Sequence, residues 1–113
     1  MSNLSPEEKV IGLIDSYRTD IVALMQKLVQ IPSYTGEEKA MGEFLVEEVK
    51  KFDLEDAQIV QELSYRPNVY AHYSGKTGKP SLTVYGHYDT VPAGDITKWT
   101  CLLYTSPSPR DRS

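Results

Sequence analysis

The sequence lacks several features that would mark particular classes of protein. Its single cysteine, Cys101, cannot form a disulfide within the chain, so we expect a reducing, cytoplasmic location. No apolar run approaches the ~18 residues that cross a bilayer, and the first residues have neither the basic start nor the apolar stretch of a secretory signal. We therefore expect no membrane partner.

Positive charge is also scarce. Twelve Lys and Arg against 16 Asp and Glu give a formal net charge of -4, and the basic residues do not cluster. Because the phosphate backbone of a nucleic acid attracts clustered cations, we expect no nucleic-acid partner. The 40% hydrophobic and 25% charged residues are typical of a globular protein, and 113 residues are enough for one ordinary domain.

The first third of the sequence has helical periodicity. Residues 5–8 (SPEE) have the pattern of a capped helix start, and Pro32 should end that helix. Between them, apolar residues recur in steps of three and four, which predicts one helix with a stripe packed in a core. The stripe consists of Val10, Ile14, Tyr17, Ile21, Leu24, Met25 and Leu28.

A second helix is predicted to start at residues 35–38 (TGEE), where the capping pattern recurs with Thr35. Its buried side should hold Met41, Phe44, Leu45, Val49 and Phe52. Three acids near its start could be metal ligands or a solvated face, and the second interpretation is favoured. These acids are Glu37, Glu38 and Glu43.

The remainder is predicted to form short strands. Residues 58–63, 68–73 and 82–85 are rich in strand formers, and residues 74–80 form a turn. Two helices followed by strands indicate an α/β fold with a mixed sheet, in which the segment Leu82–Tyr85 lies well inside.

Two motifs with chemical potential have a plainer explanation. Gly75, Lys76 and Thr77 resemble the end of a phosphate-binding loop, but Tyr70 stands where the first glycine is needed and no helix follows. A hairpin turn is the favoured interpretation. His72 lies within a strand pattern, where a structural side chain is favoured over a metal ligand.

The segment Gly86–Pro92 directly follows the predicted inner strand. Open α/β sheets place their ligand sites at the carboxyl ends of strands. In an extended segment His87 and Asp89 share one side, so the imidazole could bind a metal ion while the carboxylate orients it. Gly86 would let the chain approach such a site closely. From these residues alone, a metal site and a structural turn remain equal alternatives.

Three motifs in order carry a resemblance to a known family. They are residues 28–33 (LVQIPS), 35–38 (TGEE) and 84–95 (VYGHYDTVPAGD), with Trp99 beyond them. The sequence resembles the co-catalytic zinc amidohydrolases and peptidases, which include acetylornithine deacetylase, succinyl-diaminopimelate desuccinylase, the aminoacylases and the glutamate carboxypeptidases.

The resemblance implies a function and roles for two residues. His87 would be a ligand of one of two zinc ions, with cobalt or manganese as alternatives, and Asp89 would be the catalytic carboxylate that holds the imidazole. The implied activity is hydrolysis of amide bonds in N-acyl amino acids or small peptides. The intact form can be a homodimer in such a family.

The family's other metal ligands and its glutamate base would lie beyond Trp99. We therefore expect residues 1–100 to be the N-terminal portion of a truncated metallohydrolase catalytic domain. Residues 101–113 are expected to be an unrelated tail, an artefact of truncation. A catalytic zinc usually needs three protein ligands, so the chain alone should be inactive. The alternative is a non-catalytic binding module that uses the same helices and strands.

Overall fold

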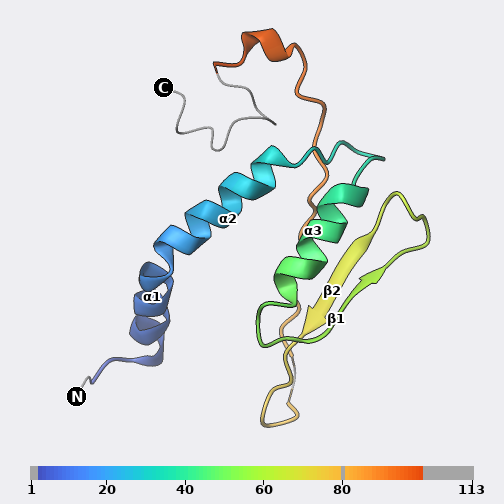
Figure 1. Cartoon of the computed structure of the whole chain (residues 1–113). Helices are drawn as coiled ribbons and strands as arrows, with labels where there is room; N and C mark the ends of the chain where they lie inside the picture. The colour runs from blue at the N-terminus through green and yellow to red at the C-terminus, as the bar shows by residue number, and fades with distance from the viewer. Residues whose placement is uncertain (1–2, 80, 101–113) are drawn as a thin grey trace. The chain divides into compact units, whose positions relative to one another are not determined.

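A computed structural model describes residues 3–79 and 81–100. The described chain forms three α-helices, two antiparallel strands and one short 3-10 helix (Figure 1). It divides into two units: one takes in the described residues up to Gln30 and from Thr97 onward, and the other is residues 31–96. The predicted combination of helices and strands is therefore present. The elements are α1 (Pro6–Ser16), α2 (Arg18–Gln30), α3 (Lys39–Val49), β1 (Glu55–Val60), β2 (Asn68–His72) and the 3-10 helix Ile96–Lys98.

Helix α1 begins where the capping pattern predicts. The Glu8 amide donates to the Ser5 hydroxyl at 3.2 Å, and the Ser5 amide donates to the Glu8 carboxylate at 2.8 Å. This reciprocal pair satisfies two amide groups that the first helical turn leaves without backbone partners.

The single helix predicted through this region is wrong, because the chain breaks into α1 and α2 at Tyr17. The hydroxyl of Ser16 donates to the Leu13 carbonyl at 2.6 Å, and Tyr17 leaves helical geometry with ψ of 10°. A serine that bonds a nearby carbonyl competes with the regular backbone ladder, which explains the break. The predicted end before Ile31 and Pro32 is confirmed, since α2 ends at Gln30.

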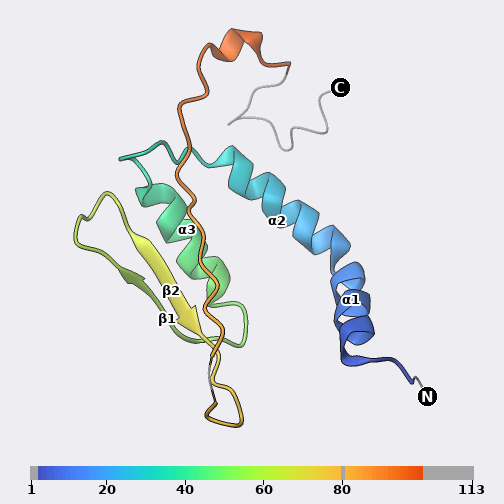
Figure 2. The same ribbon diagram turned by 180° about the vertical axis from the view of Figure 1, so that it is seen from behind.

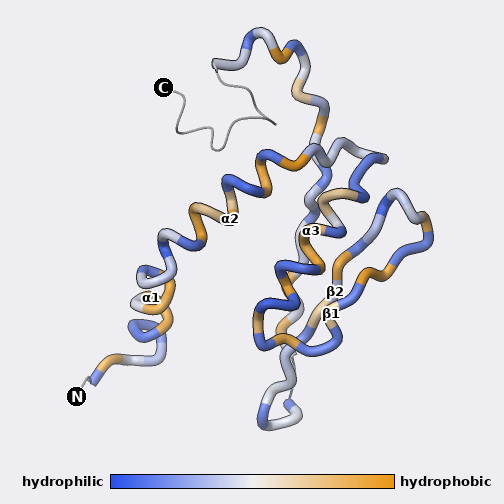
Figure 3. Tube along the Cα trace, viewed as in Figure 1, coloured by the Kyte–Doolittle hydropathy of each residue, from blue (hydrophilic) through white to orange (hydrophobic). Residues whose placement is uncertain are grey.

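The apolar stripe of α1 and α2 is not core packing in this structure. Neither helix has a buried residue, and Figure 3 shows apolar and polar positions alternating along both. The described part of this unit contains no sheet and no further α-helix on which the stripe could pack. The stripe residues that are largely exposed are Val10, Ile14, Tyr17, Ile21 and Met25.

The second unit is built on α3, which contacts both β1 and β2. The strands pair in antiparallel register, with Gln58 opposite Tyr70 and Val60 opposite Asn68. Met41, Gly42 and Val46 form the buried face of α3. Met41 was predicted there, whereas Phe52 lies beyond the end of the helix and is 59% exposed.

The start of α3 differs from the prediction. The helix begins at Lys39 with Glu38 at the N-cap and no side-chain cap, so Thr35 is not a capping residue. Residues 34–37 instead form a tight turn, in which the Glu37 amide donates to the Tyr34 carbonyl at 2.7 Å. Gly36 has a φ of +94°, which a type II turn requires at its third position and which glycine adopts without strain.

The predicted inner strand Leu82–Tyr85 is wrong for this structure. No strand of the described chain pairs with it, and Val84 and Tyr85 are 86% and 94% exposed. The two described strands form an antiparallel pair, not a mixed sheet. Without a neighbouring strand, the segment has no ladder to join. It runs in extended form alongside α3 in both views (Figures 1 and 2).

The predicted turn at residues 74–80 is likewise not a hairpin turn, because no strand follows it in the described chain. The hairpin is the one that joins β1 to β2.

Among the described residues, no helix combines the length and apolarity needed to span a bilayer. The tail predicted at residues 101–113 lies outside the described residues.

Candidate metal-binding site and its pocket

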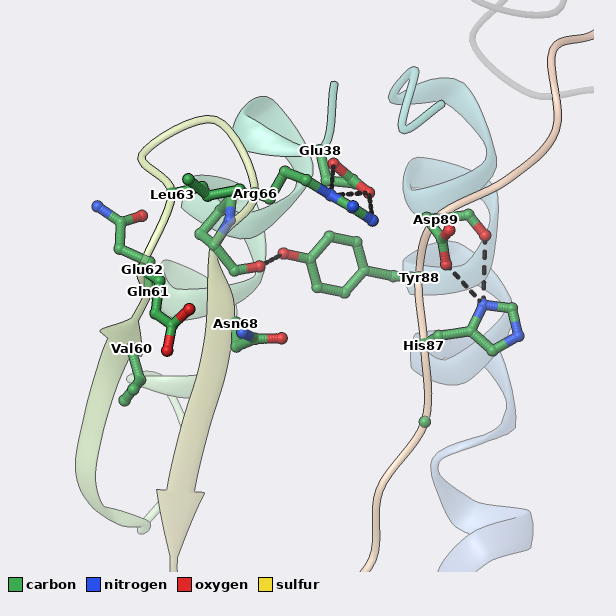
Figure 4. Close-up of a pocket in the computed structure, with 12 residues that line it drawn as sticks. Glu38, Val60, Gln61, Glu62, Leu63, Arg66, Asn68, His87, Tyr88 and Asp89 are labelled. Atoms are coloured by element: carbon green, nitrogen blue, oxygen red, sulfur yellow. Dashed lines mark hydrogen bonds and ion pairs between the residues drawn. The ribbon is translucent and has the colours of Figure 1, made fainter. Parts of the chain in front are cut away.

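His87 and Asp89 lie on the same side of the extended segment. The Nδ1 atom of His87 is 2.9 Å from Oδ1 of Asp89 and 3.3 Å from the Asp89 backbone carbonyl (Figure 4). An ionised carboxylate can only accept hydrogen bonds, so Nδ1 carries the proton and donates. Nε2, on the far side of the ring, has no hydrogen-bond partner in the described chain, and the His87 side chain is 87% exposed.

The second oxygen of Asp89 is also held. The Thr35 hydroxyl donates to Oδ2 at 2.8 Å, across 54 positions in the sequence. The hydrogen bond from Thr35 lowers the pKa of Asp89 below its ordinary value, against the opposing effect of burial and with further help from His87. Asp89 therefore stays ionised at neutral pH, with both oxygens engaged.

Backbone hydrogen bonds fix these two segments side by side. The Thr35 amide donates to the Thr90 carbonyl at 3.1 Å, and the Thr90 amide donates to the Ser33 carbonyl at 2.8 Å. Together they make a parallel bridge between Tyr34 and Thr90. The Ser33 hydroxyl, on a residue only 2% exposed, donates to the Tyr88 carbonyl at 2.8 Å. The Ser33–Thr35 segment thus serves as the support on which His87 and Asp89 are placed.

A pocket of about 600 Å³ adjoins this pair. Tyr88 points to the other side of the extended segment from His87 and Asp89, and its hydroxyl donates to the Pro67 carbonyl (Figure 4). Burial, helped by the nearby negative charges of Glu38 and Asp89, raises the pKa of Tyr88. Tyr88 therefore stays a neutral donor. The pocket is lined by Glu38, Val60, Gln61, Glu62, Leu63, Arg66, Pro67, Asn68, Gly86, His87, Tyr88 and Asp89.

Glu38 and Arg66 form an ion pair in the wall of the pocket. Nε of Arg66 donates to both Glu38 oxygens at 3.2 and 3.3 Å, and Nη2 donates to Oε1 at 3.0 Å. Burial alone would raise the pKa of Glu38, but hydrogen bonds from the Gly36 backbone and Arg66 outweigh it, so the pKa is lowered. The hydrogen bonds and charge of Glu38 in turn raise the pKa of Arg66.

The solvated-face prediction for the acids near α3 is therefore wrong for Glu38, which is only 4% exposed. Glu37 and Glu43 are exposed, as that interpretation requires. A carboxylate can be buried in its charged form only when a cation pairs with it, and for Glu38 that cation is distant in the sequence. That cation, Arg66, lies in a loop 28 positions later, and nothing in the local pattern pointed to it.

The other sequence candidates lie outside this arrangement. His72 pairs through Nε2 with Glu55 at 3.0 Å and does not line the pocket, which confirms the structural interpretation. The segment Gly75–Thr77 leads into no helix. At Gly86, an added Cβ would meet no atom of the described chain within 4 Å, so the expected close approach is not seen.

The donor set fits one part of a metal site. Nε2 of His87 is open to solvent, as a metal-binding nitrogen must be, and the two engaged oxygens of Asp89 suit an orienting carboxylate better than a ligand. Within the described ranges, no group of three or more His, Cys, Asp or Glu residues lies together as a metal site would need.

The chain is similar to curated hydrolases. It is 39% identical over 82 residues to the "Probable carboxypeptidase" of Emericella nidulans, a match that covers 72% of this chain and 19% of that protein. It is 32% identical over 83 residues to the succinyl-diaminopimelate desuccinylase of Legionella pneumophila, covering 72% of this chain and 20% of that enzyme. The chain belongs to the amidohydrolase and peptidase family of these proteins.

A further relative shows that members of this amidohydrolase and peptidase family use a metal. The Cys-Gly metallodipeptidase of Candida albicans is 29% identical over 117 residues, which cover 88% of this chain and 24% of that enzyme. The resemblance found in the sequence is thus confirmed. The chain spans about a fifth of the length of these relatives. No protein-family model matches it, and no solved structure matches it significantly.

Sequence reasoning selected His87 and Asp89 but missed the residues that support them. The pattern around Thr35 predicts a helix cap, and Ser33 enters only as the last residue of a family motif, without a structural role. The parallel bridge between residues 34 and 90 is a long-range contact, so no local pattern predicts it. The turn glycine Gly36 was the one local signal available, since it argues for a turn where a cap was assumed.

Proposed function

We propose that the chain is the N-terminal portion, residues 1–100, of the catalytic domain of a metal-dependent amidohydrolase. The substrates would be N-acyl amino acids or small peptides, in keeping with relatives named as a carboxypeptidase, a metallodipeptidase and a desuccinylase. The observation that carries the proposal is the His87–Asp89 pair, which presents an exposed imidazole nitrogen beside a pocket. Residues 101–113 would have no part in this function.

In the proposed site, His87 binds the metal through Nε2. The Asp89 carboxylate accepts a hydrogen bond from the protonated Nδ1 of His87. This hydrogen bond fixes the tautomer, sets the ring orientation and makes Nε2 a stronger ligand. When bound, two zinc ions, or cobalt or manganese in their place, would polarise the amide carbonyl and activate a water molecule.

The other parts of the site would come from beyond this segment. A catalytic zinc site usually takes three protein ligands, whereas the described residues place one imidazole for the purpose. We therefore propose that the remaining ligands and the general base lie in the region corresponding to the unmatched length of the relatives. On this proposal the 113-residue chain alone does not hydrolyse amides, and its complete form, monomer or homodimer, works in the cytoplasm.

The test is a chimera built on the Candida albicans metallodipeptidase, in which this chain replaces the segment it matches. Hydrolysis of Cys-Gly and bound zinc are measured for the chimera and for its His87→Ala variant. We expect the variant to lose more than about 100-fold in kcat/KM, because even outer partners of metal ligands cost 10–100-fold. It should also lose zinc.

His72→Gln provides the matched control, since His72 is the only other histidine of the chain. Its ring pairs with Glu55, so we expect hydrolysis and zinc content to stay within about twofold of the parent chimera. If His87→Ala retains full hydrolysis and zinc, or if both histidine variants lose them equally, His87 is not the ligand.

A second candidate function is a non-catalytic binding module. The observation in its favour is that α1 and α2 carry apolar side chains with no buried residue in either helix. A chimera that folds and binds zinc but hydrolyses neither Cys-Gly nor N-acetyl amino acids would favour the module over the enzyme.

A further inference from the structure

The hydrogen bond between Thr35 and Asp89 has no part in the roles proposed so far. Asp89 has two carboxylate oxygens: Oδ1 accepts from His87 and Oδ2 accepts from Thr35, at 2.9 and 2.8 Å. A carboxylate held at one oxygen can still rotate about its Cβ–Cγ bond, a broad torsion with little intrinsic preference. The second hydrogen bond removes that freedom.

Thr35 is itself held in place on both sides. Its amide donates to the Thr90 carbonyl at 3.1 Å, and the turn that contains it is closed by the Glu37 amide bond to Tyr34. Gly36, with its φ of +94°, allows the chain to turn away immediately after Thr35. These backbone hydrogen bonds and the turn fix the position of Thr35, from which its hydroxyl donates to Asp89.

We infer that Thr35 is a positioning residue for the proposed metal site: it holds the Asp89 carboxylate so that the His87 imidazole keeps its proton on Nδ1 and presents a bare Nε2. This inference rests on the proposed function for the role of Nε2, but the tautomer itself is a property of the metal-free chain. Thr35 acts through Asp89 and touches no reacting atom.

The hydroxyl is the group that matters, so the variants are chosen to separate it from the rest of the side chain. Thr35→Val keeps the shape and β-branching of the residue but removes the donor. Thr35→Ser keeps the donor and removes the methyl group. Thr19→Val makes the same chemical change on an exposed position of α2, which belongs to the other unit of the chain.

The experiment measures the ring nitrogen chemical shifts of His87 by NMR in the metal-free 113-residue chain at about pH 8, to determine which ring nitrogen carries the proton. In the wild type and in the Thr35→Ser and Thr19→Val variants we expect Nδ1 to carry the proton. In Thr35→Val we expect the population with the proton on Nε2 to increase at least about threefold. If Thr35 served only the backbone structure, Thr35→Val would leave the ratio of the two His87 tautomers unchanged.

The functional consequence is measured in the same dipeptidase chimera with Cys-Gly. Thr35→Val should reduce kcat by about 5- to 50-fold with little change in KM, within the range found for groups that orient metal ligands, and Thr35→Ser should restore most of the loss. If Thr35→Val does not fold, as judged from its amide spectrum, Thr35→Ala is used for both measurements.

The two proposals fail separately. An unchanged tautomer ratio in a folded Thr35→Val or Thr35→Ala chain overturns the positioning role, whatever His87 does. A shifted tautomer together with full zinc content and full hydrolysis in His87→Ala supports the positioning of the ring but overturns the proposed function. A wild-type chain with the proton on Nε2 also overturns the positioning role.

Discussion

Gly42→Ala is expected to destabilise the unit that holds the candidate site, although alanine is the better helix former. Gly42 lies on the buried face of α3, and a Cβ built there would be 2.3 Å from Cγ of Pro67 and 3.1 Å from its Cβ. The same Cβ would also be 3.1 Å from the Tyr88 hydroxyl oxygen. Non-bonded carbons pack at about 3.5–4.0 Å, so the proline ring must move by more than about 1 Å.

The magnitude follows from two opposing effects. Replacing glycine by alanine within a helix gains about 0.5–1 kcal/mol, whereas forcing extra atoms into a packed site costs about 1–3 kcal/mol. Because a proline ring is stiff and Pro67 is buried, the cost should lie near the upper end. We expect a net loss of about 1–2 kcal/mol in the free energy of unfolding of residues 31–96.

The assay is a urea titration followed through NMR signals of α3, β1 and β2, which reports on this unit alone. Gly12→Ala is the matched control, since Gly12 lies in α1 and an added Cβ there meets no atom within 4 Å. It should leave these signals unaffected. Pro67→Ala removes the Cγ atom, so Gly42→Ala made in that background should cost at least about 1 kcal/mol less. A midpoint for Gly42→Ala at or above that of the wild type would refute the reasoning.

Two further predictions concern other contacts. Ser5→Ala removes one half of the capping box of α1 and should cost about 1 kcal/mol, seen as a lower helical signal in circular dichroism; an unchanged signal would show that the cap does not hold the helix. Glu38→Gln should remove a stabilisation that depends on pH. Because the pKa of Glu38 is lowered in the folded chain, its contribution is present above the unfolded value of about 4.3 and is lost as the pH falls through the folded value. The difference in urea midpoint between wild type and Glu38→Gln should therefore shrink between pH 7 and pH 3, and a constant difference would contradict it.

Local patterns predicted the features that depend on neighbouring residues. The capping box at Ser5 and Glu8, the end of α2 before Pro32 and the two strands of the hairpin all follow from residues within a few positions of one another. The alternation of an extended chain likewise placed His87 and Asp89 on one side.

Features that depend on distant contacts were not predictable in the same way. The segment Leu82–Tyr85 has the composition of a buried strand, yet burial requires a partner strand, and the described chain offers none. The break at Tyr17 depends on one serine rotamer, which no hydrophobic period reveals. Glu38 became a buried ion pair only because Arg66 returns to it from the loop after β1.

The parallel bridge between residues 34 and 90 has a consequence for the order of events during folding. Hairpin and helix form from neighbours in the sequence, whereas this bridge closes a long stretch of chain and is delayed by the entropy of doing so. We therefore expect the Thr35–Asp89 hydrogen bond, whose two segments this bridge joins, to form after the helix and the hairpin. A short peptide spanning residues 86–92 would contain both His87 and Asp89 but would lack the hydrogen bond from Thr35, so the positioning proposed for the imidazole depends on tertiary structure.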